Sequence, residues 1–115
     1  MEIDKQLLKV VLDSLNSKKA ERIVIMNLTG KSDLCDYQVV CSGQTEPQTI
    51  AIADALEKNL RNTLKIKPAA IEGRKTGHWI LMDYGSLMIH VFTETLRDYY
   101  AIEDIWPDTV IDHQQ

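Results

Sequence analysis

Three features are scarce in this chain of 115 residues: cysteine, basic charge and long apolar runs. Its two cysteines, Cys35 and Cys41, are predicted to be free thiols in a reducing cytoplasm rather than a disulfide framework. The formal net charge of −4 argues against a protein that binds nucleic acid through a basic face, so no direct sequence-specific nucleic-acid contact is expected. Because no apolar run approaches the roughly 20 residues of a membrane helix, we expect no membrane partner.

Catalytic and cofactor motifs are also missing. The sequence contains neither a G-x-x-x-x-G-K-[ST] phosphate loop nor a G-x-G-x-x-G dinucleotide fingerprint. The one stretch comparable to a nucleophile elbow, Tyr84-Gly85-Ser86, joins two expected strands and leads to no helix. His78 and His90 could approach each other, but zinc requires at least three protein ligands. We therefore expect no catalytic residue, no cofactor and no metal.

One enzyme class remains as an alternative. Ser42-Gly43 follows an expected strand and opens an expected helix, which resembles the start of the nucleotidyltransferase signature. Such enzymes need a pair of carboxylates on a following strand to hold magnesium. The candidate strands offer only the isolated carboxylates Glu72 and Asp83, so the metal chemistry of that class is not encoded.

The apolar pattern predicts an α/β domain with the element order α-β-β-α-β-β-β-α, built on a small mixed sheet of about five strands. The helix at 45–64 begins with a capping box and is long enough to be a parallel crossover, whereas the connections at 29–35 and 83–86 are expected to be antiparallel. A final helix is predicted from Thr93 to Pro107. The single domain is expected over residues 1–107, with a flexible tail at 108–115. The expected strands are 22–28, 36–41, 69–73 and the two halves of 78–92.

The segment 78–92, HWILMDYGSLMIHVF, is predicted to be a hairpin whose strands are almost wholly apolar. A sheet with one wet face normally alternates apolar and polar residues. The second face is therefore either a covered core face or a spare apolar surface. A two-residue turn at Tyr84-Gly85 would pair Trp79 with His90, and a three-residue turn with a bulge would pair Trp79 with Ile89. Residue preference favours the bulge, because tyrosine tolerates a positive φ poorly.

This hairpin and the segment after it closely resemble the Iojap family of bacterial ribosomal silencing factors (RsfS). The family run is W-x-L-x-D-x-G-x-x-x-x-H-x-F, then R-x-x-Y-x-L-E-x-L-W. The matched positions, all in register, are Trp79, Leu81, Asp83, Gly85, His90, Phe92, Arg97, Tyr100, Glu103 and Trp106. Upstream, Cys41-Ser42-Gly43 also matches, so the resemblance covers about residues 3–107. Pro47 departs from it, since relatives often carry a basic residue there.

The resemblance implies a nucleotidyltransferase-like fold without catalytic activity, in a cytoplasmic protein. It implies binding to the large ribosomal subunit through ribosomal protein L-fourteen, on the face that joins the small subunit. A protein placed there would block subunit joining by steric occlusion and lower translation when nutrients are limiting. An acidic chain also suits a basic protein partner.

Aromatic and methionine side chains concentrate at the cores of protein interfaces, so the resemblance places the docking residues on the hairpin. The predicted protein-binding residues are Trp79, Leu81, Asp83, Tyr84, Met88 and His90. A second cluster is predicted to anchor the last helix by packing: Arg97, Tyr99, Tyr100, Glu103 and Trp106. Because Arg97 and Glu103 are six residues apart, no ion pair between them is assumed. A generic dimerising module with a self-complementary hairpin face is a further alternative, and a homodimer is compatible with the ribosomal role.

Overall fold

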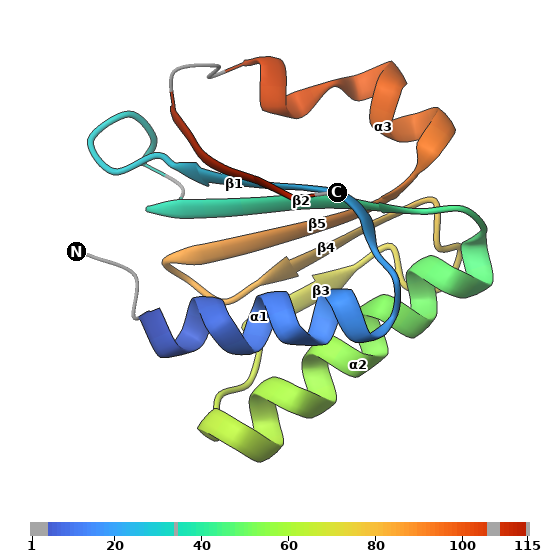
Figure 1. Cartoon of the computed structure of the whole chain (residues 1–115), viewed down its shortest axis with the longest axis horizontal. Coiled ribbons are helices and arrows are strands. Elements are labelled where there is room, and N and C mark those ends of the chain that lie inside the picture. The colour runs from blue at the N-terminus through green and yellow to red at the C-terminus, as the bar shows by residue number, and fades with distance from the viewer. Residues whose placement is uncertain (1–4, 34, 106–108, 115) are drawn as a thin grey trace.

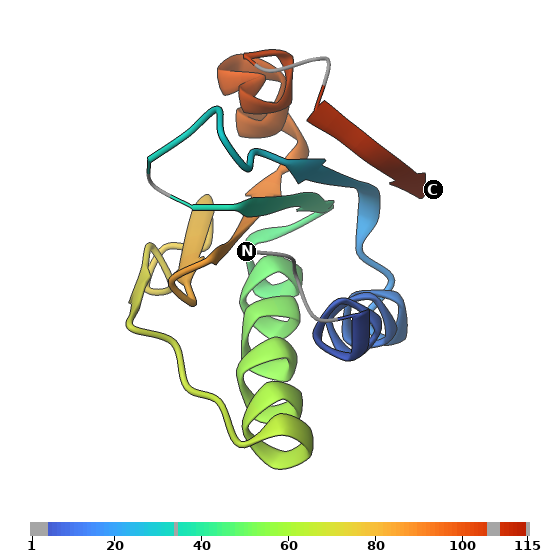
Figure 2. The same cartoon turned by 90° about the vertical axis from the view of Figure 1, so that its left-hand side faces the viewer.

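The chain folds into a six-stranded mixed sheet between two helical layers (Figures 1 and 2). A computed structural model describes residues 5–33, 35–105 and 109–114; Trp106 and Pro107, at the predicted end of the last helix, lie outside them. Helices α1 and α2 cover one face of the sheet and α3 lies on the other. The elements are α1 (Lys5–Ser17), β1 (Glu21–Asn27), β2 (Tyr37–Gly43), α2 (Glu46–Leu64), β3 (Ala70–Glu72), β4 (Trp79–Asp83), β5 (Leu87–Thr93), α3 (Glu94–Tyr100), a 3-10 turn η1 (Ile102–Asp104) and β6 (Val110–Gln114).

The strands lie in the order β3-β4-β5-β2-β1-β6. The central strands β2 and β5 are parallel, and every other neighbouring pair is antiparallel. The predicted α/β class and element order are confirmed, as are the antiparallel connections at 29–35 and 83–86. Helix α2 is the crossover: its N-cap Thr45 accepts a hydrogen bond from the backbone N–H of Gln48 through Oγ1 at 3.2 Å, as the capping box predicts.

The sixth strand was not expected. Residues 110–114 pair antiparallel with β1 between Ile23 and Met26, so the predicted flexible tail at 108–115 is wrong for this stretch. Backbone pairing explains the difference, because β1 would otherwise present a row of unpaired N–H and C=O groups at the edge of the sheet. The sequence VIDHQ contains too few apolar residues to indicate a strand by its pattern alone.

The hairpin register differs from both alternatives. Trp79 pairs with Phe92, Leu81 with His90, and Asp83 with Met88, which leaves Gly85-Ser86 as the two-residue loop. Gly85 takes the positive φ of 84°, and its N–H donates to the Asp83 carboxylate at 2.8 Å. The loop is shifted by one residue because glycine, rather than tyrosine, occupies its first central position.

This register sorts the hairpin side chains onto two faces. The face beneath α1 and α2 is a closed core, and the hairpin contributes to it Ile80, Met82, Leu87, Ile89 and Val91, all fully buried. The opposite face carries Trp79, Leu81 and Asp83 beside Phe92, His90 and Met88. There α3 and η1 cover a smaller core centred on Met26, Val40 and Phe92, with Trp79 and Met88 only partly buried at its margin.

The last helix is shorter than predicted. Helix α3 stops at Tyr100 because Ala101 adopts a left-handed conformation with φ 45°, and its N–H donates to the carbonyl of Arg97 at 2.9 Å. The chain then reverses into η1. This reversal, which no glycine signals in the sequence, returns Glu103 toward the base of α3.

Candidate protein-binding surface

The hairpin and α3 together form one aromatic surface on the half-covered face of the sheet. Its centre is Trp79, whose ring centroid lies 4.7 Å from that of Tyr100, and Tyr100 in turn meets Tyr99 edge-on at 5.0 Å. Tyr100 is 46% exposed and Tyr99 is 77% exposed. We define the aromatic surface by its members: Trp79, Leu81, Met88, Tyr99 and Tyr100.

The Trp79 ring is held from beneath. It stacks on buried Phe92 with a centroid separation of 4.9 Å and an interplanar angle of 25°. Offset stacking of this kind contributes about 1 kcal/mol beyond area burial. One face of the indole is therefore fixed by the smaller core.

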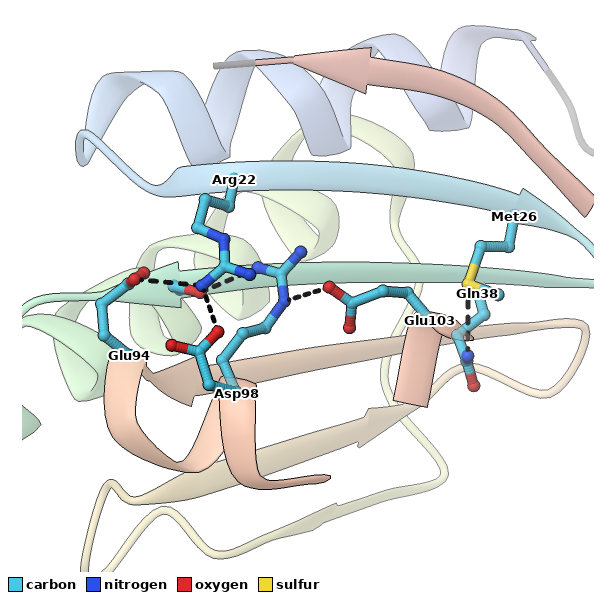
Figure 3. A network of polar contacts seen from close by, with 8 residues as sticks. Arg22, Met26, Gln38, Glu94, Asp98 and Glu103 are labelled. Atoms are coloured by element: carbon cyan, nitrogen blue, oxygen red, sulfur yellow. Dashed lines mark hydrogen bonds and ion pairs between the residues drawn. The ribbon is translucent and has the colours of Figure 1, made fainter. Parts of the chain in front are cut away.

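The indole edge is fixed by a chain of hydrogen bonds that runs across the sheet. Trp79 Nε1 donates to His90 Nδ1 at 3.0 Å, and His90 Nε2 lies 3.0 Å from Gln38 Oε1. Gln38 Nε2 donates to the Met26 sulfur at 3.6 Å (Figure 3). Burial lowers the pKa of His90 to about 4, so the ring is neutral at pH 7. With Nδ1 accepting, the ring proton sits on Nε2 and donates to Gln38.

The predicted docking residues are not all on this surface. Trp79, Leu81, Asp83 and Met88 are half-buried on the face away from α1 and α2. His90 is on the same face but only 6% exposed, so it supports Trp79 from below.

Tyr84, the remaining predicted docking residue, packs instead against the core beneath α1 and α2. Burial raises the pKa of its hydroxyl to about 12. The side chain of Tyr84 therefore lies apart from the aromatic surface.

Helix α3 is fastened to the sheet by two arginines. Arg97, only 1% exposed, donates from Nε to Glu103 Oε2 and from Nη1 to the Ser42 hydroxyl, both at 2.8 Å. Arg22, in a bulge of β1 with φ 52°, reaches Glu94 at 3.1 Å and Asp98 at 2.8 Å (Figure 3). The anchoring role predicted for Arg97 and Glu103 is thus seen, and it includes an ion pair that the spacing did not suggest.

The same cluster also contains a wrong prediction. Tyr99 was expected to pack against the domain, yet most of its side chain is exposed. Residues adjacent on a helix point about 100° apart, so Tyr99 and Tyr100 could not both face one narrow core. The sequence alone could therefore have indicated that one of the two tyrosines is exposed. Sequence reasoning also missed Gln38. It is one polar residue in a predicted strand, and no neighbouring residue indicates a hydrogen bond with His90.

A shallow cavity of about 460 Å³ lies where β2 and β5 end and the chain enters α2 and α3. Within it His78 and Glu46 form an ion pair when the histidine is protonated. The cavity lining is Gln44, Thr45, Glu46, His78, Thr93, Thr95 and Leu96. Over the described residues, histidine, cysteine and carboxylate side chains form no group of three that could hold a metal, and no helix is long and apolar enough to span a bilayer.

Comparison with known proteins identifies relatives over nearly the whole chain. A model of the family described as "Ribosomal silencing factor during starvation" (RsfS) matches residues 2–115. A ribosomal silencing factor RsfS from Halalkalibacterium halodurans is 34% identical over 105 residues, which are 91% of this chain and 89% of that protein. A mouse protein named "Mitochondrial assembly of ribosomal large subunit protein 1" is 26% identical, over 91% of this chain and 47% of its own length.

The fold agrees with these relatives. A crystal structure of a protein from Chromobacterium violaceum matches with a TM-score of 0.86 and 28% identity, covering 93% of this chain and 88% of that one. The resemblance predicted from the hairpin and the last helix is therefore confirmed.

Proposed function

Because this chain belongs to the ribosomal silencing factor family and so has a ribosome-associated silencing role, we propose that it binds the large ribosomal subunit through ribosomal protein L-fourteen and blocks subunit joining. The name of the mouse relative links that protein to the large ribosomal subunit. The protein acts in the cytoplasm, and its mode of action is occlusion rather than turnover.

The aromatic surface is the observation that carries this proposal. Trp79 and Tyr100 are in ring contact, and Tyr99 extends the surface into solvent. A monomer gains no core packing from an exposed tyrosine, whereas tyrosine and tryptophan supply much of the binding energy at protein interfaces. We place the L-fourteen contact on this surface.

Charge around the surface favours a basic partner. Asp83 lies at the hairpin end of the same face, in a chain of net charge −4. Complementary charge speeds encounter and excludes wrong partners more than it adds affinity. The ribosomal partner is thus expected to present basic side chains around an apolar centre.

The size of the domain suffices for occlusion. Its extents are 34 × 33 × 24 Å. Surfaces in contact in an assembled complex are separated by only a few ångströms, so the domain does not fit between them. A body of this size bound where the two subunits touch keeps the small subunit from closing onto the large one. No chemical step is required.

The proposal is tested by sedimenting the protein with isolated large or small ribosomal subunits and measuring subunit joining by light scattering. We expect co-migration with large subunits alone and reduced joining. Tyr99→Ser should weaken both effects by about tenfold without loss of stability, since an exposed interface tyrosine is worth on the order of 1.4 kcal/mol. The matched control is Lys9→Ser, an exposed change on α1 at the other side of the sheet.

Two outcomes contradict the proposal. If the protein stays at the top of the gradient with large subunits in excess, the ribosomal partner is wrong. If Tyr99→Ser and Lys9→Ser bind equally well, the partner stands but the aromatic surface is not the docking site. Light scattering of the free protein checks the competing reading, in which this surface joins two copies of the chain.

A further inference from the structure

We infer that Gln38 is a positioning residue for docking: through His90 it holds the Trp79 indole in the orientation that the partner meets. The inference rests on the proposed function for its last step, the contact with the partner. Gln38 belongs to β2, two strands away from Trp79 in the sheet, and was not among the predicted docking residues.

The chain of contacts leaves only one arrangement of protons. Trp79 Nε1 can only donate, so His90 Nδ1 accepts at 3.0 Å and the ring proton is on Nε2. Nε2 then needs an acceptor, which is the Gln38 carbonyl oxygen at 3.0 Å. The Gln38 amide nitrogen faces the sulfur of Met26, a weak acceptor, and this fixes the direction of the amide.

Burial makes His90 depend on Gln38 for a hydrogen-bond acceptor. Gln38 and His90 are each 6% exposed, so the ring N–H has no ready water to replace the Gln38 oxygen. A buried donor without an acceptor costs about 1–3 kcal/mol, which favours rotation of the ring toward solvent. Rotation would withdraw Nδ1 from Trp79 and free the indole to turn. The Gln38 carbonyl thus preserves the hydrogen bond between Trp79 and His90, although it takes no part in that bond.

Orientation of the indole matters because Trp79 is the centre of the aromatic surface. Its ring touches Tyr100 on α3 and stacks on Phe92, so a turn of the ring reshapes the surface around it. An interface side chain held in its bound orientation beforehand avoids about 0.5–1.5 kcal/mol of ordering cost on binding. Gln38 therefore acts on affinity without touching the partner.

The test replaces Gln38 by methionine, which keeps the approximate length of the side chain and removes the acceptor. Nitrogen chemical shifts of His90 report the tautomer, and hydrogen exchange of the Trp79 indole N–H reports its hydrogen bond. In Gln38→Met we expect loss of the single Nε2–H form, at least about tenfold faster indole exchange, and binding to large subunits weaker by up to about tenfold.

Leu28→Val is the matched control, since it disturbs the same small core but changes no member of the hydrogen-bond chain from Trp79 to Met26. A merely structural role would lower stability in both variants and leave the His90 tautomer unchanged in both. In a Trp79→Phe background, which lacks the indole N–H, Gln38→Met should weaken binding no further.

Three results would overturn the inference: a wild-type His90 with its proton on Nδ1, an unchanged tautomer and indole exchange in Gln38→Met, or equal loss of binding by Gln38→Met with and without the Trp79 indole. The wild-type measurement needs no variant to fold. If wild-type protein does not bind large subunits at all, the proposed function fails and the docking step fails with it. The tautomer and exchange data then decide separately whether Gln38 positions Trp79.

Discussion

Arg97 and Glu103 form an ion pair at 2.8 Å, although they are six positions apart in the sequence and Arg97 is in α3 while Glu103 is in η1. The left-handed Ala101 between the two elements makes this approach feasible. Arg97 also holds the hydroxyl of fully buried Ser42 at the end of β2. One guanidinium therefore joins α3, η1 and the sheet.

Arg97→Met should destabilise the fold by about 3 kcal/mol, because removal of one partner leaves the Glu103 carboxylate with no compensating charge. Glu103 is 16% exposed, so some water reaches it and the loss should fall at the lower end of the range for buried pairs. Urea unfolding measures the change. The double variant Arg97→Met, Glu103→Leu should recover part of it; equal instability of the single and double variants would show that packing, not charge, carries the effect.

The stability of the fold should fall as the pH drops below 6.5. Unfolded His90 takes up a proton near its ordinary pKa of 6.5, whereas the folded residue, with its pKa lowered to about 4 by burial, does not. Between these values the unfolded state binds more protons, so stability is present above pH 6.5 and is lost toward pH 4. From pH 7 to pH 5 the His90 contribution should be about 2 kcal/mol.

Urea unfolding of wild type and His90→Asn at both pH values isolates this term, because the carboxylates contribute equally to both proteins. The variant should lose about 2 kcal/mol less than wild type over the interval. Lys58→Gln, an exposed change on α2 that removes no histidine, serves as the control and should follow wild type. Parallel pH curves for wild type and His90→Asn would refute a buried neutral imidazole.

Two glycines with the same φ of 84° should respond differently to alanine. At Gly85 an added Cβ meets no atom of the described residues within 4 Å, so only the left-handed backbone is penalised, by about 1 kcal/mol. At Gly73 the Cβ would stand 1.9 Å from the Trp79 carbonyl oxygen, and the cost should exceed about 3 kcal/mol. Thermal or urea unfolding of the two alanine variants measures both, and similar losses would contradict the close approach of Gly73 to β4.

Thr45→Ala should cost about 1 kcal/mol, because the backbone N–H of Gln48 loses its acceptor at the start of α2. Thr63→Ala, on an exposed position near the end of the same helix, is the matched control. Urea unfolding compares the two. Equal stability of both variants would show that the cap contributes nothing to the fold.

The sequence predicted those parts of the fold that depend on local residue types. Apolar β-branched runs gave the strands, and Thr45 with Gln48 gave the start of α2. The errors arose where a backbone conformation or a distant partner decides the outcome. Ala101 is left-handed without being glycine, and β6 exists because β1 has an open edge.

The candidate site shows the same division. The hairpin composition predicted an apolar surface around Trp79, and the resemblance to the silencing factor family implied a ribosomal partner for it. Tyr84 was predicted as a docking residue at the turn, but the loop lies one residue later and Tyr84 directly continues β4. Strand alternation then places its side chain with Ile80 and Met82, on the face away from Trp79. The link from Gln38 to Trp79 depends on the parallel pairing of β2 with β5, which the sequence pattern does not specify.

The pairing of Ile23 with Gln114 has a consequence for the order in which this protein assembles. Contacts between residues close in sequence form quickly, whereas those between distant residues must first overcome the entropy of closing a long loop. The β4–β5 hairpin closes a loop of two residues, and β1–β6 closes nearly the whole chain. The hairpin that carries Trp79 is therefore expected to form early in folding, and β6 to join the sheet last.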